Sequence, residues 1–158
     1  MINELRELGV THSSQPAWPL ARVYPEPATT FAGSIDLSDQ TAGWVLEAAA
    51  KLEALGRFQP GWDSYSGLPL QRSAKDLTVR TLRWLRSDEL PVPAVVLGSG
   101  GTVQLEWRTN DKELEVELRD NNTIEYVKVS SGGAIEEGEV TADLSAKLHD
   151  LSRWLLLH

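Results

Sequence analysis

The stretch from Gln59 to Pro69 constrains the fold most, because it places two Pro and two Gly within eleven residues. Pro fixes φ and lacks an amide hydrogen, and Gly accepts a positive φ, so a helix cannot run through this stretch. The sequence therefore predicts one helix before it and one after it. Trp62 and Tyr65 are predicted to reach back into a core, and Asp63 to bond to backbone amides of the loop. Two interpretations stay open: a buried clamp between the helices, or a binding site on a rigid scaffold.

Apolar residues at helical spacing support both helices. The first is expected from Asp39 to Leu55, and the second from Gln71 to Arg86. The second helix has a basic arc opposite its apolar stripe, formed by Arg72, Lys75, Arg80, Arg83 and Arg86. This basic face is predicted either to be solvated or to dock an acidic partner or RNA phosphates.

From Pro91 and Pro93 onward, turn signals at even spacing separate short alternating segments. They predict a four-stranded antiparallel meander over residues 94–97, 102–107, 113–119 and 123–129. The last of these segments alternates poorly, which indicates a bulge or burial of both faces. Residues 131–133 are predicted to end the sheet, and a last helix to begin near Thr141. The predicted fold class is α+β, with two N-terminal helices, the meander, and a C-terminal helix packed on one sheet face.

Residues 1–36 are predicted to form a Pro-rich extended arm, and residues 37–158 a single α+β domain. The arm contains Trp18, Tyr24 and Phe31, so it is expected to lie across its own domain or across a partner. The absence of Cys excludes disulfides and thiol nucleophiles. The sequence shows neither a signal-peptide core nor a membrane span, which predicts a cytoplasmic protein without a membrane partner.

The net charge of −8 is local, because residues 102–139 contain ten Asp or Glu and four Lys or Arg. Strand alternation places Glu106, Glu113, Glu115 and Glu117 together on the outer face of the predicted sheet. Like charges that face each other across a ladder repel. The acidic face is either a solvated surface with edge protection or a surface for a basic protein partner. The net charge also predicts that the chain does not bind bulk DNA.

The sequence shows no pattern typical of catalysis. Its three His are His12, His149 and His158, and they match neither a nucleophile pattern nor metal-ligand spacing. Residues 98–101 are glycine-rich, but they indicate a hairpin turn more than a phosphate-binding loop. The sequence therefore predicts a non-enzymatic protein with no catalytic residues, no metal and no cofactor.

Several motifs together resemble a pattern in short bacterial proteins of unassigned function. The motifs are the loop 61–69, the helix that follows it, a Pro-x-Pro strand entry and the segment from Gly101 to Trp107. The family pattern has a Trp-Asp-rich loop that ends in Pro and a Gly-x-(Ile/Val)-x-Leu-Glu-Trp hairpin. The match covers roughly residues 50–130. The resemblance implies the fold and a bacterial or mobile-element origin, but no chemistry.

The predicted function is binding of another macromolecule. The preferred class is a neutralising or adaptor protein (an antitoxin, an immunity protein or a phage-encoded inhibitor) whose acidic sheet face meets a basic protein. Trp62, Asp63 and Tyr65 form a second candidate binding site on the loop. One alternative is an accessory subunit of a nucleoprotein assembly that contacts RNA through the basic helix. Another is a structural homo-oligomer that uses the Trp-rich arm.

Overall fold

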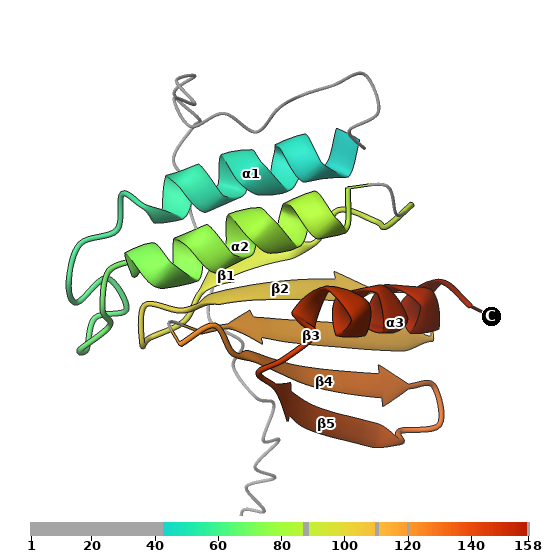
Figure 1. Cartoon of the computed structure of the whole chain (residues 1–158). Helices are drawn as coiled ribbons and strands as arrows, with labels where there is room; N and C mark the ends of the chain where they lie inside the picture. Colours follow the sequence, from blue (N-terminus) through green and yellow to red (C-terminus); the bar gives the residue numbers. More distant parts are fainter. Residues whose placement is uncertain (1–42, 87–88, 110, 120, 158) are drawn as a thin grey trace, which may run out of the picture.

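The computed structural model describes residues 43–86, 89–109, 111–119 and 121–157. In this part of the chain two helices, α1 (Gly43–Leu55) and α2 (Arg72–Trp84), come before the sheet, and a third, α3 (Leu144–Leu156), follows it (Figure 1). The predicted α+β class is therefore confirmed. The arm over residues 1–36, the domain boundary after it and the predicted helix start at Asp39 lie outside the described residues.

Within the described residues, the sheet has five antiparallel strands in the order β1-β2-β3-β4-β5. Their bounds are Ala94–Leu97, Val103–Arg108, Lys112–Leu118, Ile124–Ser130 and Ile135–Val140. The prediction of four strands is therefore wrong. Residues 131–133 do not end the sheet but close a hairpin, in which the Ser130 amide donates to the Ala134 carbonyl oxygen and Gly133 takes a φ of +74°. β5 is hard to recognise because four of its six residues are Glu or Gly, which are depleted in strands.

The helices bury the apolar stripes that their spacing predicts. In α1 the buried residues are Trp44, Val45, Ala48, Ala49, Leu52 and Leu55. In α2 the buried residues are Ala74, Leu77, Thr78, Thr81 and Leu82. The apolar face of each helix thus supplies one side of the core.

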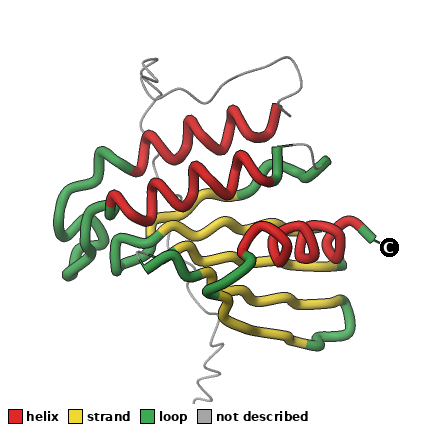
Figure 2. The backbone as a smooth tube through the Cα atoms, viewed as in Figure 1, coloured by secondary structure: helices red, strands yellow, loops and turns green. Residues whose placement is uncertain are grey.

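The three described helices lie on one face of the sheet, which we call the inner face (Figures 1 and 2). α1 contacts β1, α2 contacts β2 and β3, and α3 contacts β3. α2 also contacts both other helices, so it occupies the middle of the layer. The inner face of the two central strands is buried, through Val103, Leu105, Trp107, Leu114, Val116 and Leu118. The opposite side of the sheet, the outer face, is not covered by any described helix.

Lysines help to hold α3 on the sheet. The Trp154 ring of α3 contacts two lysines, with the Nζ atoms of Lys112 and Lys128 at 5.2 and 5.0 Å from the ring centroid. Lys112 also donates to the Trp154 carbonyl oxygen at 2.7 Å, near the C-terminal end of the helix, where a cation is favoured. Lys128 is paired with Glu136 at 2.7 Å. These contacts join α3 to β3, β4 and β5.

The irregularity predicted in the fourth strand has a simple cause. β3 and β4 pair without interruption from Lys112↔Ser130 to Leu118↔Ile124, so the paired segment has no bulge. Ile124, Tyr126 and Lys128 lie on the inner face, and Val127 and Val129 lie on the outer face, where they are only partly buried. The alternation is regular, but a lysine is turned inward and valines are turned outward.

We expect Gly138→Ala to lower the free energy of unfolding by about 1–3 kcal/mol, because a Cβ at this position of β5 would overpack the Tyr126 ring. Such a Cβ would come within 2.7 Å of the Tyr126 hydroxyl oxygen. Gly132→Ala is the matched control, since a Cβ there meets nothing within 4 Å, and it should be neutral or slightly stabilising. Urea denaturation measures both variants. Equal stabilities would contradict the packing of β5 on β4.

Candidate functional site

The register of the sheet brings the four predicted glutamates together on the outer face. Glu106 pairs with Glu115, Arg108 with Glu113, and Gln104 with Glu117. The next two strands extend the same face with Glu125, Val127 and Val129 on β4 and with Ile135, Glu137 and Glu139 on β5. The geometric prediction for Glu106, Glu113, Glu115 and Glu117 is thus correct, while their role in binding stays a prediction. The sequence analysis did not include residues of β4 and β5 in the acidic face. The Gly-rich turn at residues 131–133 was the available signal, because such a turn between two strands indicates a hairpin.

Arginines neutralise part of this acidic face. Arg108 pairs with Glu113 at 3.0 Å, at the end of the two central strands. Arg119 contacts Glu117 at 3.3 Å and Glu125 at 2.6 Å, so one guanidinium joins two neighbouring strands. The remaining carboxylates of the face are Glu106, Glu115, Glu137 and Glu139, and the described part of the chain supplies no ion pair to any of them.

Glu115 experiences the repulsion within this face most directly. Partial desolvation raises the pKa of Glu115, and the charges of Glu106 and Glu117 raise this pKa further, while a hydrogen bond from Gln104 opposes the shift. A raised pKa means that the folded protein disfavours the ionised carboxylate. Desolvation is the larger cause and like charge the smaller one, and positive charge from outside would relieve the like-charge part at neutral pH.

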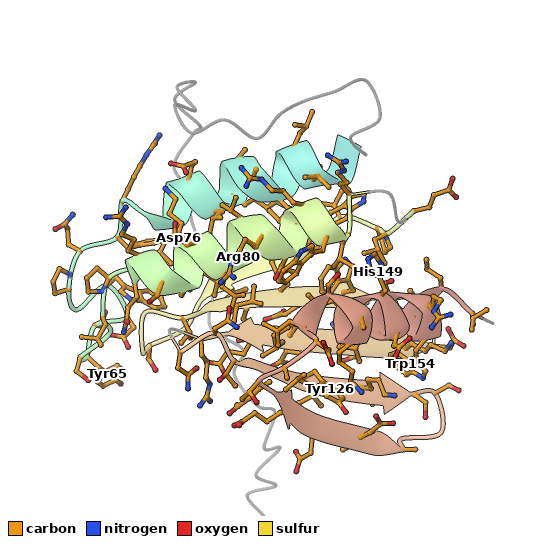
Figure 3. All side chains as sticks on the ribbon, in the orientation of Figure 1. Tyr65, Asp76, Arg80, Tyr126, His149 and Trp154 are labelled. Carbon is orange, nitrogen blue, oxygen red and sulfur yellow. The ribbon has the colours of Figure 1, made fainter. Side chains whose placement is uncertain are left out.

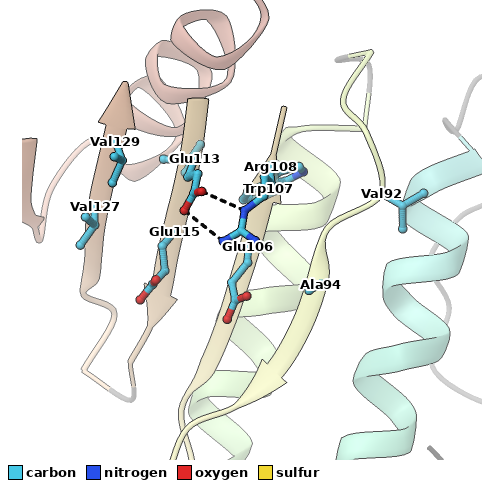
Figure 4. Close-up of a pocket in the computed structure, with 10 residues that line it drawn as sticks. Val92, Ala94, Glu106, Trp107, Arg108, Glu113, Glu115, Val127 and Val129 are labelled. Carbon is cyan, nitrogen blue, oxygen red and sulfur yellow. Dashed lines mark hydrogen bonds and ion pairs between the residues drawn. The ribbon is translucent and has the colours of Figure 1, made fainter. Parts of the chain in front are cut away.

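A hollow of ≈ 330 Å³ lies on the outer face around these residues (Figure 4). Val127 and Val129 line one side of it and Val92 and Ala94 the other, with Glu106 and Glu115 between them. Charged and apolar groups thus alternate across the hollow. Its described lining contains no His, Cys, Ser or Thr, so it offers carboxylates and apolar surface but no hydroxyl, thiol or imidazole nucleophile.

The loop between α1 and α2 is held by its own side chains. The Asp63 carboxylate accepts hydrogen bonds from the amides of Tyr65 and Gly67, both at 2.9 Å, as predicted for a self-supporting turn. These two bonds hold the pKa of Asp63 below its ordinary value of 3.8. The Trp62 indole donates to the Leu68 carbonyl oxygen at 3.0 Å, and its ring packs at 5.5 Å from the Phe58 ring.

The loop is also attached to the turn between β1 and β2. The Leu68 amide donates to Ser99, and the Gln71 amide donates to Gly101. Gly101 has a φ of +77°, and a Cβ at this position would lie 2.5 Å from the Pro69 carbonyl oxygen. Only Gly fits such a close approach at positive φ. The glycine-rich turn therefore serves as a docking point for the loop, in agreement with its interpretation as a hairpin turn.

The two aromatic residues of the loop have different positions, which corrects the prediction that both reach the core. Trp62 is half-buried and packs against the core, whereas Tyr65 is 89% exposed and points away from the helices (Figure 3). Ser64 has a φ of +68°, and this left-handed residue turns the chain so that the next side chain faces outward. The clamp interpretation thus describes Trp62 and Asp63 but is wrong for Tyr65.

Most basic side chains of the predicted basic face of α2 contact other residues of this chain. Lys75 pairs with Glu53 of α1 at 2.6 Å, and Arg72 lies 3.8 Å from Asp76. Arg80 donates to the Asn122 side chain at 2.7 Å and lies over the Trp84 ring. Arg83 is exposed in the last turn of α2, and Arg86 is exposed in the turn that follows the helix. Four of the five predicted basic residues share one side of α2, where Asp76 lies among them, and Arg86 lies beyond the end of the helix.

Two further observations concern the described residues alone. They contain no cluster of three or more His, Cys, Asp or Glu that could hold a metal ion. In this part of the chain, every helix is too short or too polar to cross a bilayer.

A pair of loop variants tests the different roles of the two aromatic residues. Trp62→Ala should lower the free energy of unfolding by about 1–3 kcal/mol, less than the ~3–5 kcal/mol of a fully buried Trp, because the ring is half-exposed. Tyr65→Ala is the control and should change stability by less than about 0.5 kcal/mol. Chemical denaturation of both variants is the measurement. A Tyr65→Ala variant as unstable as Trp62→Ala would contradict the exposed position of Tyr65.

The repulsion at Glu115 predicts a pH-dependent effect on stability. Because the folded-state pKa is raised, the ionised group destabilises the fold at pH values above both pKa values and has no effect below them. Glu115→Gln should therefore be more stable than the parent at pH 7 by a few tenths of a kcal/mol, given the screening of an exposed group. The difference should disappear below about pH 4. Thermal or urea denaturation over this range measures it, and a loss of stability at pH 7 would show that Glu115 is held by favourable contacts.

Comparison with known proteins assigns the chain to no family. Family models, curated proteins and solved structures were all compared with the chain, and none of the three comparisons finds a match. The resemblance of the loop and hairpin motifs to short bacterial proteins therefore stays a prediction. The functional proposal below rests on the described residues.

Proposed function

We propose that this chain is a non-enzymatic protein that binds a basic protein through the outer face of its sheet, as a neutralising or adaptor protein. Antitoxins, immunity proteins and phage-encoded inhibitors are the classes that fit this mode of action. One observation carries the proposal. A sheet face that no described helix covers contains four carboxylates to which the described residues supply no ion-pair partner.

Electrostatics supports a basic partner. Glu106 and Glu115 are directly opposite each other on neighbouring strands, and like charges in this position destabilise a sheet. Lysines or arginines of a partner would relieve this repulsion on binding. Complementary charge also speeds diffusional encounter and rejects partners of the wrong sign.

Apolar side chains on the same face support a protein partner over a small ion. Val127 and Val129 are partly exposed beside the glutamates, and Ile135 is 68% exposed on the neighbouring strand. Interfaces between proteins combine apolar contact area with a polar rim, and the outer face has both. A face that serves only to contact solvent has use for the charged side chains, but not for the exposed Val and Ile side chains beside them.

The other two candidate functions have less support. RNA binding through α2 requires free basic side chains, yet Arg72, Lys75 and Arg80 each contact a residue of this chain. Homo-oligomerisation through the arm concerns residues outside the described part of the chain. We therefore keep the basic-protein partner as the proposed function.

A double variant of the outer face tests this proposal. Glu106→Gln with Glu115→Gln removes two carboxylates that lack ion pairs, whereas Glu47→Gln with Asp76→Asn removes two helix carboxylates and changes the net charge equally. Proteins captured from an extract of the native host are compared quantitatively among parent and variants. We expect a basic protein to be retained by the parent and the helix variant and to be lost by the outer-face variant. With that protein purified, association at low salt should slow about tenfold or more in the outer-face variant only.

Two results would contradict the proposal. Retention of the same proteins by the outer-face and helix variants would show that the acidic face is not the binding surface. Submicromolar binding to random single-stranded RNA, lost when Arg80 and Arg83 are changed to Glu, would favour the nucleoprotein alternative.

A further inference from the structure

We propose that the partner contributes an extended basic segment that pairs with β5 as a sixth strand of the sheet. This inference rests on the proposed function and specifies the part of the partner that binds. Among the residues that the structure describes, β5 is an edge strand, because their strand order ends with it. An edge strand has a row of backbone amides and carbonyls that can pair with another chain.

The hydrogen-bond pattern shows which residues have these open groups. The Arg119 amide donates to the Thr123 carbonyl oxygen, so the odd-numbered residues of β4 form their backbone hydrogen bonds with β3. The Ser130 amide donates to the Ala134 carbonyl oxygen, so the even-numbered residues of β4 form theirs with β5. Backbone groups of an antiparallel strand alternate between its two neighbours. The amides and carbonyls of Ile135, Glu137 and Glu139 must therefore point away from β4, toward the open edge.

The opposite edge of the sheet is less suited to pairing. β1 has only four residues and follows Pro91 and Pro93, which lack amide hydrogens. The Pro93 carbonyl oxygen accepts a hydrogen bond from Lys51 of α1. Proline and short length are common ways to protect a sheet edge. β5 has six residues and no Pro, so it is longer and less protected than β1. An added strand would therefore pair with β5.

The side chains of β5 indicate the chemistry of the added strand. Ile135, Glu137 and Glu139 have their side chains on the outer face, and a residue paired opposite any of them shares that face. Lys or Arg opposite Glu137 and Glu139 would complement their charges, and the alkyl stem of a Lys opposite Ile135 would pack against its side chain. A second copy of β5 would instead place Glu opposite Glu. The occupant is therefore a basic strand of a different protein.

A designed peptide tests strand addition directly. The probe is a capped peptide of about seven residues, near the usual strand length, in which Lys and Val alternate. Its control has the same composition with the lysines grouped at one end. The alternating peptide should bind more tightly, and at saturation it should slow hydrogen exchange of the Ile135, Glu137 and Glu139 amides about tenfold. Two-dimensional amide NMR measures both effects in the full chain.

Proline variants separate backbone pairing from charge. Glu137→Pro removes an amide that points to the open edge and leaves the β4 ladder intact, so we expect it to weaken peptide binding about tenfold or more. Glu137→Gln keeps that amide and removes only the charge, and it should weaken binding about two- to fivefold. Glu139→Pro is the second variant and should behave like Glu137→Pro, so the test does not depend on one folded variant.

Three results would overturn the inference. Equal binding of the two peptides, or proline variants that bind no worse than Glu137→Gln, would exclude backbone pairing. Self-association of the free protein with protection of the β5 amides would show that a second copy occupies the edge. Peptide-induced shifts around Glu106 and Glu115 without protection of the β5 amides would exclude strand addition while the acidic face remains a binding surface. The failure of this inference is thus distinct from the failure of the proposed function.

Discussion

The pairing register of the antiparallel sheet is the constraint on which the rest of the structure depends. Side chains alternate between the two faces of a strand, so one residue of slippage would exchange the buried and exposed sets. With Leu105 opposite Val116 and Glu106 opposite Glu115, the helices receive the apolar side chains of these two strands and the outer face receives the acids. The core and the acidic face therefore arise from the same register, and neither can be changed without the other.

The sequence predicts what depends on strong periodicity and misses what depends on single backbone conformations. The apolar stripe of α1 and the grouping of Glu106, Glu113, Glu115 and Glu117 follow from regular spacing. β5 was missed because it contains little apolar signal and is recognisable as a strand only through its pairing with β4. The sequence misplaced Tyr65 because Ser64, the residue before it, has a positive φ. A positive φ is uncommon for a residue other than Gly and cannot be recognised from a serine in the sequence.

The loop after α1 links the helical layer to the sheet at one end. Asp63 and Trp62 hold the loop, and the loop is hydrogen-bonded to the turn at residues 98–101. Thr102, directly after that turn, donates to Glu117 of the outer face at 2.8 Å. A change in the loop that moves this turn can therefore reach the acidic face through two hydrogen-bonded steps, although Trp62 and Asp63 lie in a different part of the chain.

The distribution of arginines supports the proposal that the outer face binds a basic protein. Arg119 joins Glu117 and Glu125 across two strands, so the chain can neutralise like charges where strand pairing requires it. At Glu106 and Glu115, the equivalent repulsion is left in place beside exposed valines. A face selected only for charge would gain stability from one more arginine there. Uncompensated carboxylates next to apolar surface make sense when the compensating cations belong to another protein.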